Sequence, residues 1–186
     1  QEVSFPVAIC GMCGNAEDVD YYKFTGKAGQ LVTINIYAQR VTKAVHSMQS
    51  GGSGASVMYL MDSILTLRRS NGQILADNDN FVGGDSFLTC KLPADGSYFL
   101  EVRDTRFIGN PKYVYCVEIA DRPFAHAVFP MAVQQGQTIE AAIVGHNLGA
   151  LEKTTLRSAA GDSLGWKRIS ITTPQGQTNP VPVLVS

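Results

Sequence analysis

The chain has 186 residues, enough for one large all-β domain or two small ones with a sizeable apolar core. Its 15 Lys and Arg residues nearly balance its 16 Asp and Glu residues, so no strong overall charge steers it toward nucleic acid or an anionic membrane surface. The longest dense apolar run, Val57 to Met61, is far shorter than the roughly 20 residues of a transmembrane helix. We therefore expect neither a nucleic-acid partner nor membrane insertion.

The start of the chain and its cysteines bear on where the protein works. The sequence opens on Gln1-Glu2-Val3 without a signal peptide, so we expect a mature form or a piece of a longer protein, and a processed export signal fits this start. The four cysteines, an even number, suit a disulfide-permissive compartment.

Short runs with β-type composition, separated by Gly, Asn, Asp and Pro, recur along the chain, and no long segment has helical periodicity. The sequence therefore predicts an all-β protein. The dipeptides Asn71-Gly72 and Asp95-Gly96 predict tight turns, because glycine tolerates positive φ. In chain order, the predicted strands are 3–10, 20–25, 31–38, 63–69, 74–76, 86–92, 96–104, 113–119, 125–129, 138–146, 154–158, 167–173 and 181–185.

Alternation within these strands assigns side chains to two faces, since successive residues of a strand point to opposite sides. The pattern favours stacked antiparallel layers, each with one wet face. The predicted inward rows are Val32, Ile34 and Ile36; Leu88, Cys90 and Leu92; Tyr98, Leu100 and Val102; and Tyr115, Val117 and Ile119.

Two interruptions organise the chain. Pro123, after Arg122, lacks the backbone N–H that would continue the hydrogen bonds of a β-sheet, and a new set of strands begins after it. This predicts one domain over 1–121 and another over 122–186. The segment from Thr42 to Met61 breaks the alternation and contains Gly51-Gly52-Ser53-Gly54. We interpret it as a long loop, either functional or a tolerated surface insertion.

Ordered motifs over about residues 3–121 resemble the bacterial pre-peptidase C-terminal (PPC) domain. They are Ala16-Glu17-Asp18-Val19-Asp20-Tyr21-Tyr22-Lys23-Phe24, Asn71-Gly72-Gln73-Ile74-Leu75-Ala76-Asp77-Asn78-Asp79, and Leu92-Pro93-Ala94-Asp95-Gly96-Ser97-Tyr98 followed by Glu101-Val102-Arg103-Asp104. The resemblance implies a jelly-roll-type β-sandwich that serves as an accessory module of secreted bacterial proteins, notably beside peptidases. It also implies a secreted, periplasmic or cell-surface location and other domains of a parent chain as partners.

The remaining segment is similar to an immunoglobulin-like module of the IPT/TIG type. The similarity is carried by Phe129-Pro130, Gln135-Gly136-Gln137-Thr138, Val144-Gly145-His146-Asn147-Leu148 and Thr178-Asn179-Pro180-Val181-Pro182. Such modules often follow PPC domains in large exported proteins. At about 65 residues, it is short for a sandwich of roughly 100.

Several common catalytic motifs are missing from the sequence. The H-E-x-x-H zinc motif does not occur, there is no P-loop or Rossmann fingerprint, and Gly51-Gly52-Ser53-Gly54-Ala55 does not fit the G-x-S-x-G nucleophile elbow. We therefore expect no enzymatic activity from this chain.

Acidic turns are the strongest candidate for a metal site. Several oxygen ligands from one turn suit Ca²⁺, which accepts irregular coordination by carboxylates and amides, and some PPC domains bind calcium. Asp and Asn also dominate turns by bonding their own backbone, so turn chemistry is the alternative. The candidate calcium ligands are Asp77, Asp79, Asn80 and Asp85, with Asp18 and Asp20 in another loop.

The alternation of side chains along the predicted strands assigns the cysteines to inward or outward faces. Cys90 falls in an inward row, whereas Cys10 and Cys116 fall outward, which favours the disulfides Cys10–Cys116 and Cys13–Cys90. A four-cysteine zinc site is the alternative, although such sites normally have two C-x₂-C knuckles. A thioredoxin-like role is disfavoured because no βαβ pattern surrounds Cys10-Gly11-Met12-Cys13.

Aromatic rings and planar polar groups are what a sugar-binding surface needs. We expect a non-catalytic binding or targeting module for polysaccharide or an extracellular protein, and the alternative is a structural spacer or folding module of a larger exported protein. The candidate ligand-binding residues are Arg103, Asp104, Arg106 and Phe107, together with Tyr37 and Trp166.

Overall fold

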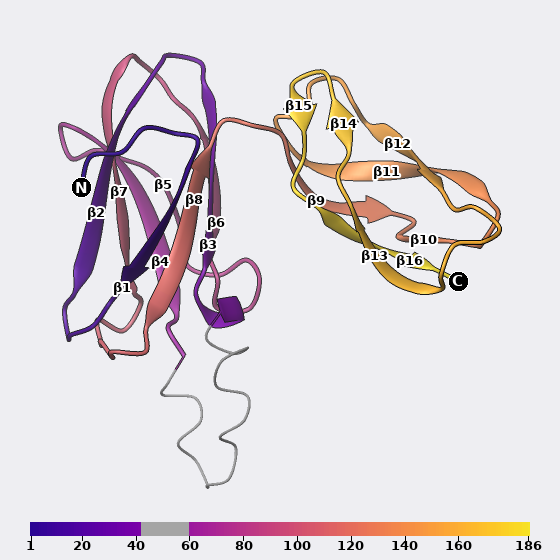
Figure 1. Ribbon diagram of the computed structural model, residues 1–186. Coiled ribbons are helices and arrows are strands. Elements are labelled where there is room, and N and C mark those ends of the chain that lie inside the picture. The colour runs from indigo at the N-terminus through magenta and orange to yellow at the C-terminus, as the bar shows by residue number, and fades with distance from the viewer. Residues whose placement is uncertain (42–59) are drawn as a thin grey trace, which may run out of the picture. The chain divides into compact units, whose positions relative to one another are not determined.

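The computed structural model describes residues 1–41 and 60–186 and divides them into two compact units, Gln1–Asp121 and Arg122–Ser186 (Figure 1). Nearly all of the predicted loop from Thr42 to Met61 lies outside the described residues. Strands dominate both units, so the all-β prediction is confirmed. Within the described ranges, no helix has the length and apolar character needed to cross a membrane.

The first unit is a sandwich of two four-stranded antiparallel sheets, ordered β1-β8-β3-β6 and β2-β7-β4-β5 (Figure 1). Alternating apolar residues explain this arrangement, because each strand hides one row between the sheets and shows the other to solvent. The strands are β1 (Val7–Met12), β2 (Val19–Gly26), β3 (Leu31–Tyr37), β4 (Ser63–Arg69), β5 (Ile74–Asn78), β6 (Phe87–Lys91), β7 (Gly96–Asp104) and β8 (Val114–Ala120).

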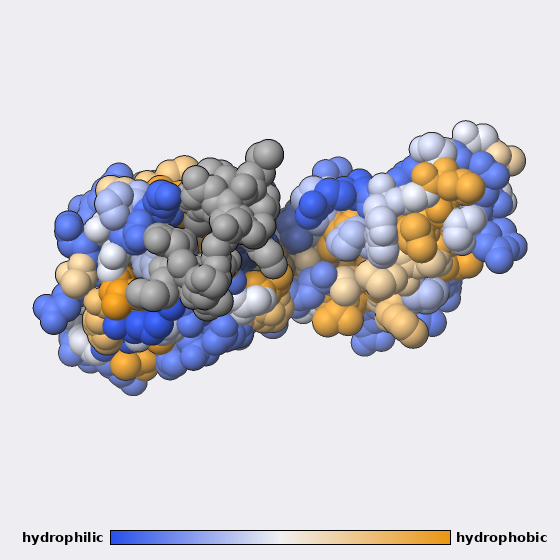
Figure 2. Space-filling model, turned by 90° about the horizontal axis from the view of Figure 1, so that it is seen from below, coloured by the Kyte–Doolittle hydropathy of each residue, from blue (hydrophilic) through white to orange (hydrophobic). Residues whose placement is uncertain are grey.

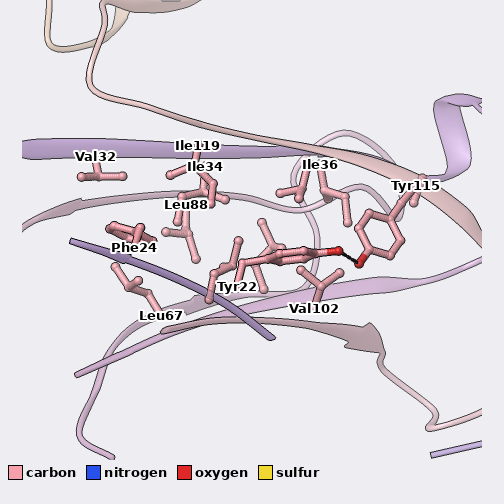
Figure 3. Packing of buried hydrophobic residues seen from close by; sticks show 14 of the residues in the cluster. Tyr22, Phe24, Val32, Ile34, Ile36, Leu67, Leu88, Val102, Tyr115 and Ile119 are labelled. Atoms are coloured by element: carbon pink, nitrogen blue, oxygen red, sulfur yellow. Dashed lines mark hydrogen bonds between the residues drawn. The ribbon is translucent and has the colours of Figure 1, made fainter. Parts of the chain in front are cut away.

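The core of the first unit lies between these two sheets (Figure 3). Its buried rows are the predicted ones, with Cys90 only partly buried against them. The hydroxyls of Tyr22 and Tyr115 are hydrogen-bonded at 2.6 Å, and the Tyr115 hydroxyl also donates to Asp20. Gly11 faces this pair, and a Cβ there would lie 2.4 Å from the Tyr115 ring. Glycine at position 11 therefore makes room for a satisfied polar network inside the core.

The second unit has sheets β12-β11-β9 and β10-β16-β13 and the hairpin β14-β15. Its own apolar cluster is aliphatic. β10 and β16 are parallel, whereas the prediction was of antiparallel layers. The strands are β9 (Phe124–Phe129), β10 (Ala132–Val133), β11 (Thr138–His146), β12 (Lys153–Arg157), β13 (Gly165–Ile169), β14 (Thr172–Thr173), β15 (Gly176–Gln177) and β16 (Val181–Val185).

Two loops interlock at one end of the first unit. Glu17 and Phe107 both have positive φ, of 63° and 54°, and the Glu17 N–H donates to the Phe107 carbonyl at 2.9 Å. A Cβ on Gly109 would lie 1.8 Å from the Asn15 carbonyl oxygen. Non-glycine residues seldom adopt this backbone region, so the surrounding contacts must hold it. The interlock fixes the position from which the Phe107 ring projects.

Candidate ligand-binding site

A buried carboxylate lies on the outer face of the sheet β2-β7-β4-β5. Glu101, in the middle of β7, is only 7% exposed. It accepts hydrogen bonds from Arg68 Nε at 3.1 Å, from Arg103 Nε at 3.2 Å and from the Tyr21 hydroxyl at 3.4 Å. The two guanidinium groups offset its charge, and charge-assisted hydrogen bonds of this kind hold side chains firmly.

The sheet register builds this arrangement. Tyr21 on β2 and Thr66 on β4 are the direct cross-strand neighbours of Glu101, so the three side chains form one row across the sheet. Alternation in β7 sends Leu100 and Val102 into the core and Glu101 outward.

An exposed ring adjoins the carboxylate. The Arg103 guanidinium lies 4.1 Å from the centroid of the Phe107 ring, a cation–π contact. Phe107 is 48% exposed and Tyr21 is 49% exposed. Burial and the charge of Glu101 raise the pKa of Tyr21, so its hydroxyl remains a neutral donor. We call Tyr21, Arg68, Glu101, Arg103 and Phe107 the Glu101 cluster.

Exposure alone does not single out a site. Figure 2 shows orange apolar patches among blue polar residues on the face in view, and large apolar side chains are exposed on both units. The Glu101 cluster differs because its exposed rings lie beside a buried carboxylate that is paired with two partly exposed arginines. It contains aromatic faces, guanidinium donors and a carboxylate. This set of groups can recognise a polar ligand with apolar faces.

The predicted ligand residues are only partly brought together. Arg103 and Phe107 belong to the cluster, but Tyr37 lies on the other sheet, under the Arg40 guanidinium at 4.1 Å. Trp166 is 64% exposed on β13 of the second unit.

Asp104 has a structural role, which corrects its prediction as a ligand residue, whereas Arg106 is exposed and its ligand role stays a prediction. The Asp104 side chain is buried and accepts hydrogen bonds from the Asp62 N–H and from the backbone and guanidinium of Arg106. Arg106 also donates to the Leu60 carbonyl at 3.0 Å. Their polar groups therefore tie the chain near Leu60 to the end of β7.

The predicted calcium ligands do not converge. Asp85 is fully buried, and its carboxylate accepts from the backbone N–H groups of Ala38, Gln39 and Arg40 and from Arg40 Nε at 2.5 Å. Such saturation leaves no room for a metal, so Asp85 is a capping and ion-pairing residue.

The other candidate calcium ligands are dispersed. Asp77, Asp79 and Asn80 are exposed, Asp18 accepts from the Gly14 N–H, and Asp20 accepts from Tyr115. Across residues 1–41 and 60–186, no three His, Cys, Asp or Glu side chains gather as a metal site requires. Calcium binding stays a prediction without a site in the described residues.

The cysteines divide into one matched pair and two separate residues. Cys10 on β1 lies directly opposite Cys116 on β8. Cys13 is buried next to β1, whereas Cys90 is on β6 at the opposite edge of the sheet, with β8 and β3 between them. At about 4.8 Å per strand, this separation far exceeds what a disulfide spans, so the Cys13–Cys90 prediction is wrong.

Sequence reasoning missed Tyr21, Arg68 and Glu101 as members of one site. They come from three strands and are close only because of the register between β2, β7 and β4. The signal available beforehand was the outward parity of Glu101 and Arg103 on one predicted strand.

Comparison with known proteins finds a family similarity within the first unit. Residues 18–104 match the family model of the bacterial pre-peptidase C-terminal domain. Over 89 residues, the chain is 44% identical to a protein of Deinococcus radiodurans named as a probable subtilase-type serine protease. That match covers 48% of this chain and 10% of the relative, so the chain spans about a tenth of the relative's length. The segment that matches the PPC family model lies entirely within the first unit.

Solved structures with low sequence identity were also found. The pre-peptidase C-terminal domain of a Bacillus anthracis collagenase has a TM-score of 0.44 and 13% identity, covering 63% of this chain and 91% of that one. A periplasmic inhibitor of g-type lysozyme from Aeromonas hydrophila has a TM-score of 0.37 and 19% identity, covering 64% and 97%.

Proposed function

We propose that this chain, whose residues 18–104 match the PPC domain, is a non-catalytic module of a larger exported bacterial protein and that it binds polysaccharide through the Glu101 cluster. The observation that carries the proposal is the pair of exposed rings, Tyr21 and Phe107, beside the buried Glu101 carboxylate and its two partly exposed arginines. The naming of the Deinococcus relative as a protease supports attachment to a secreted enzyme.

The chemistry of the cluster matches that of a sugar ring. The apolar face of a pyranose packs against an aromatic ring, and its hydroxyls pair with planar donors and acceptors. Among the described contacts, Arg68 commits Nε alone to Glu101, so its terminal N–H groups can donate to a ligand. Because Glu101 already orients both arginines, little side-chain entropy remains to be lost on binding.

Retention on insoluble polysaccharide tests the proposal. The full chain is incubated with cellulose, chitin and starch granules, and the bound fraction is compared with that of Phe107→Asn and Phe81→Asn. Asparagine is chosen because it tolerates the positive φ at position 107. Phe81 is the matched control, since it is also 48% exposed and lies outside the cluster.

We expect binding of the native chain to at least one polysaccharide, a loss of about fivefold or more for Phe107→Asn, and native retention for Phe81→Asn. Equal losses for both variants would remove the cluster as the site. No binding to these probes or to a glycan array would overturn polysaccharide recognition, and binding to an extracellular protein would then be the hypothesis to pursue.

A spacer or folding module is the second candidate. Each unit has its own apolar cluster, which is what serial spacer modules require. This candidate predicts that the native chain binds no glycan, and that deleting its residues from the parent protein lowers the yield of secreted, active parent. Normal secretion of a shortened parent would contradict it.

A further inference from the structure

Cys10 and Cys116 occupy the geometry of a cross-strand disulfide. They are direct partners in the antiparallel pair β1–β8, and both lie on the outer face of their sheet, because Ile9 and Tyr115 point into the core. Directly opposite residues have Cβ atoms about 4.5–5.5 Å apart, close to the separation in disulfides. In the described state both are thiols.

The other two cysteines have no comparable partner position. Cys13 is fully buried, whereas Cys10, three residues earlier, is exposed. Burial raises the pKa of the Cys13 thiol to about 12, which keeps it protonated and unreactive. Cys90 is on β6, separated from β1 by β8 and β3.

A hollow gives access to the matched pair. It has a volume of about 570 Å³, and its lining includes Cys10, Met12, Val41, Val114 and Cys116. Cys10 is exposed, while Cys116 is half-buried. Burial and the hydrogen bond to Cys10 raise the pKa of Cys116 to about 11. Cys10 is therefore the first sulfur that a reagent can reach.

We propose that Cys10 and Cys116 form a single disulfide by exchange with an external oxidised dithiol or glutathione disulfide, while Cys13 and Cys90 remain thiols. The Cys10 thiolate attacks one sulfur of the external disulfide, and the other sulfur leaves as a thiolate. Cys116 then loses its proton to water and attacks Cys10 Sγ. The Cys10–Cys116 bond forms, and the second external sulfur leaves as a thiolate. Two electrons pass from the protein to the external disulfide, which is reduced.

The proposed Cys10–Cys116 disulfide would join the edge strand β1 to its neighbour β8. β1 is an edge strand, and it carries Gly11, against which the Tyr22–Tyr115 pair packs. An edge strand offers unpaired backbone groups and separates readily. A covalent link to β8 keeps Gly11 over the tyrosine pair and protects the polar network of the core.

Peptide mapping tests the connectivity. The full chain is equilibrated with oxidised and reduced glutathione, alkylated in denaturant, and cleaved with cyanogen bromide and trypsin without reduction. Cleavage after Met12 separates Cys10 from Cys13. We expect one linked peptide containing Cys10 and Cys116, two alkylated cysteines, Cys13 and Cys90, and an intact mass lower by about 2 Da before alkylation. Cys90→Ser must keep the link, and Cys116→Ser must lose it.

Four alkylated cysteines, or a link that includes Cys13 or Cys90, would overturn the proposal. The order of attack is tested separately with an aromatic disulfide reagent on folded single variants. Cys10 in Cys116→Ser should react at least about tenfold faster than Cys116 in Cys10→Ser. Equal rates would contradict Cys10 as the entering thiol. Both rates must be measured on folded protein. The melting curve of each variant is therefore recorded first, so that a loss of stability is detected before the rates are compared.

Discussion

The cores of the two units differ in the side chains they bury. The first unit packs aromatic rings between its sheets, with Phe24 edge-on to Phe5 and stacked on Tyr98. The cluster of the second unit consists of Ala, Val, Ile and Leu. Aromatic residues bury about 150–250 Å² each and pack with specific geometry, whereas small aliphatic residues fill a thinner core. We therefore expect the first unit to bury more apolar side-chain surface than the second.

The units also differ in their buried polar groups. In the first unit, Glu101, Asp104 and Asp85 are buried charges with ion-pair partners. In the second, Ser158, Thr173 and Thr178 are buried. Buried charges are tolerated only when they are fully paired, so they fix the positions of the side chains that pair with them. This explains why a preorganised surface cluster is found on the first unit.

The largest effects should come from truncating each core. Phe24→Ala should lower the free energy of unfolding of the first unit by about 4 kcal/mol, because it removes a fully buried ring and leaves a cavity. Val183→Ala should cost the second unit about 2 kcal/mol. Calorimetry of the full chain should show two transitions, each moved by one variant. If both variants move one shared transition, the units do not unfold independently.

Removing the charge of Asp85 should have an effect between those of the two core truncations. Asp85→Asn replaces one oxygen by an NH₂ group facing the N–H donors of residues 38–40, and it leaves Arg40 without its carboxylate. We expect a loss of about 2–3 kcal/mol, confined to the first unit. Chemical denaturation with and without calcium measures it.

The same measurement examines the calcium prediction. If Asp85 acts only as a cap and ion-pair partner, millimolar calcium changes the stability of the native chain and of Asp85→Asn equally. A calcium-dependent gain that disappears in Asp85→Asn would restore Asp85 as a ligand and contradict its assigned role.

The strands could be predicted where alternation is regular. The ranges 63–69, 96–104, 138–146 and 181–185 were predicted with the observed bounds, because each places an apolar row on one side. The two-residue strands β10 and β15 were missed, since two residues carry no period, and the predicted strand 167–173 is divided between β13 and β14. The parallel pairing of β10 with β16 joins distant segments and leaves no local pattern.

The candidate site was only half predictable for a related reason. Arg103 and Phe107 are close in sequence, so local reasoning found them, but Tyr21 and Arg68 reach Glu101 only through sheet register. Asp85 was misassigned because an Asp after a polar turn looks the same whether its carboxylate faces solvent or caps buried backbone. Cys90 was paired wrongly because parity assigns a face without giving the strand order.

The smallest expected effect concerns pH and the second unit. His126 and His146 lie with ring centroids 4.9 Å apart, and Phe124 contacts His126 at 5.2 Å. Burial, together with the charge of His146, lowers the pKa of His126 to about 4, and burial lowers the pKa of His146. An unfolded chain with ordinary histidines binds more protons between pH 4 and 6.5. The free energy of unfolding of the second unit is therefore highest above pH 6.5 and falls as the pH is lowered toward 4.

Because both rings are partly exposed, solvent reduces this effect to about 1 kcal/mol, or about 5 °C in the melting temperature of a unit this small. Calorimetry at pH 7 and pH 4.5 should show the fall in the second transition, and His126→Gln should reduce it. A carboxylate such as Asp162, whose pKa is lowered by hydrogen bonds, adds a fall of the same sign only near and below pH 4, and the variant leaves that fall in place. An unchanged pH dependence in His126→Gln would show that the histidine pair is already solvated and that the second unit is looser there than its aliphatic core implies.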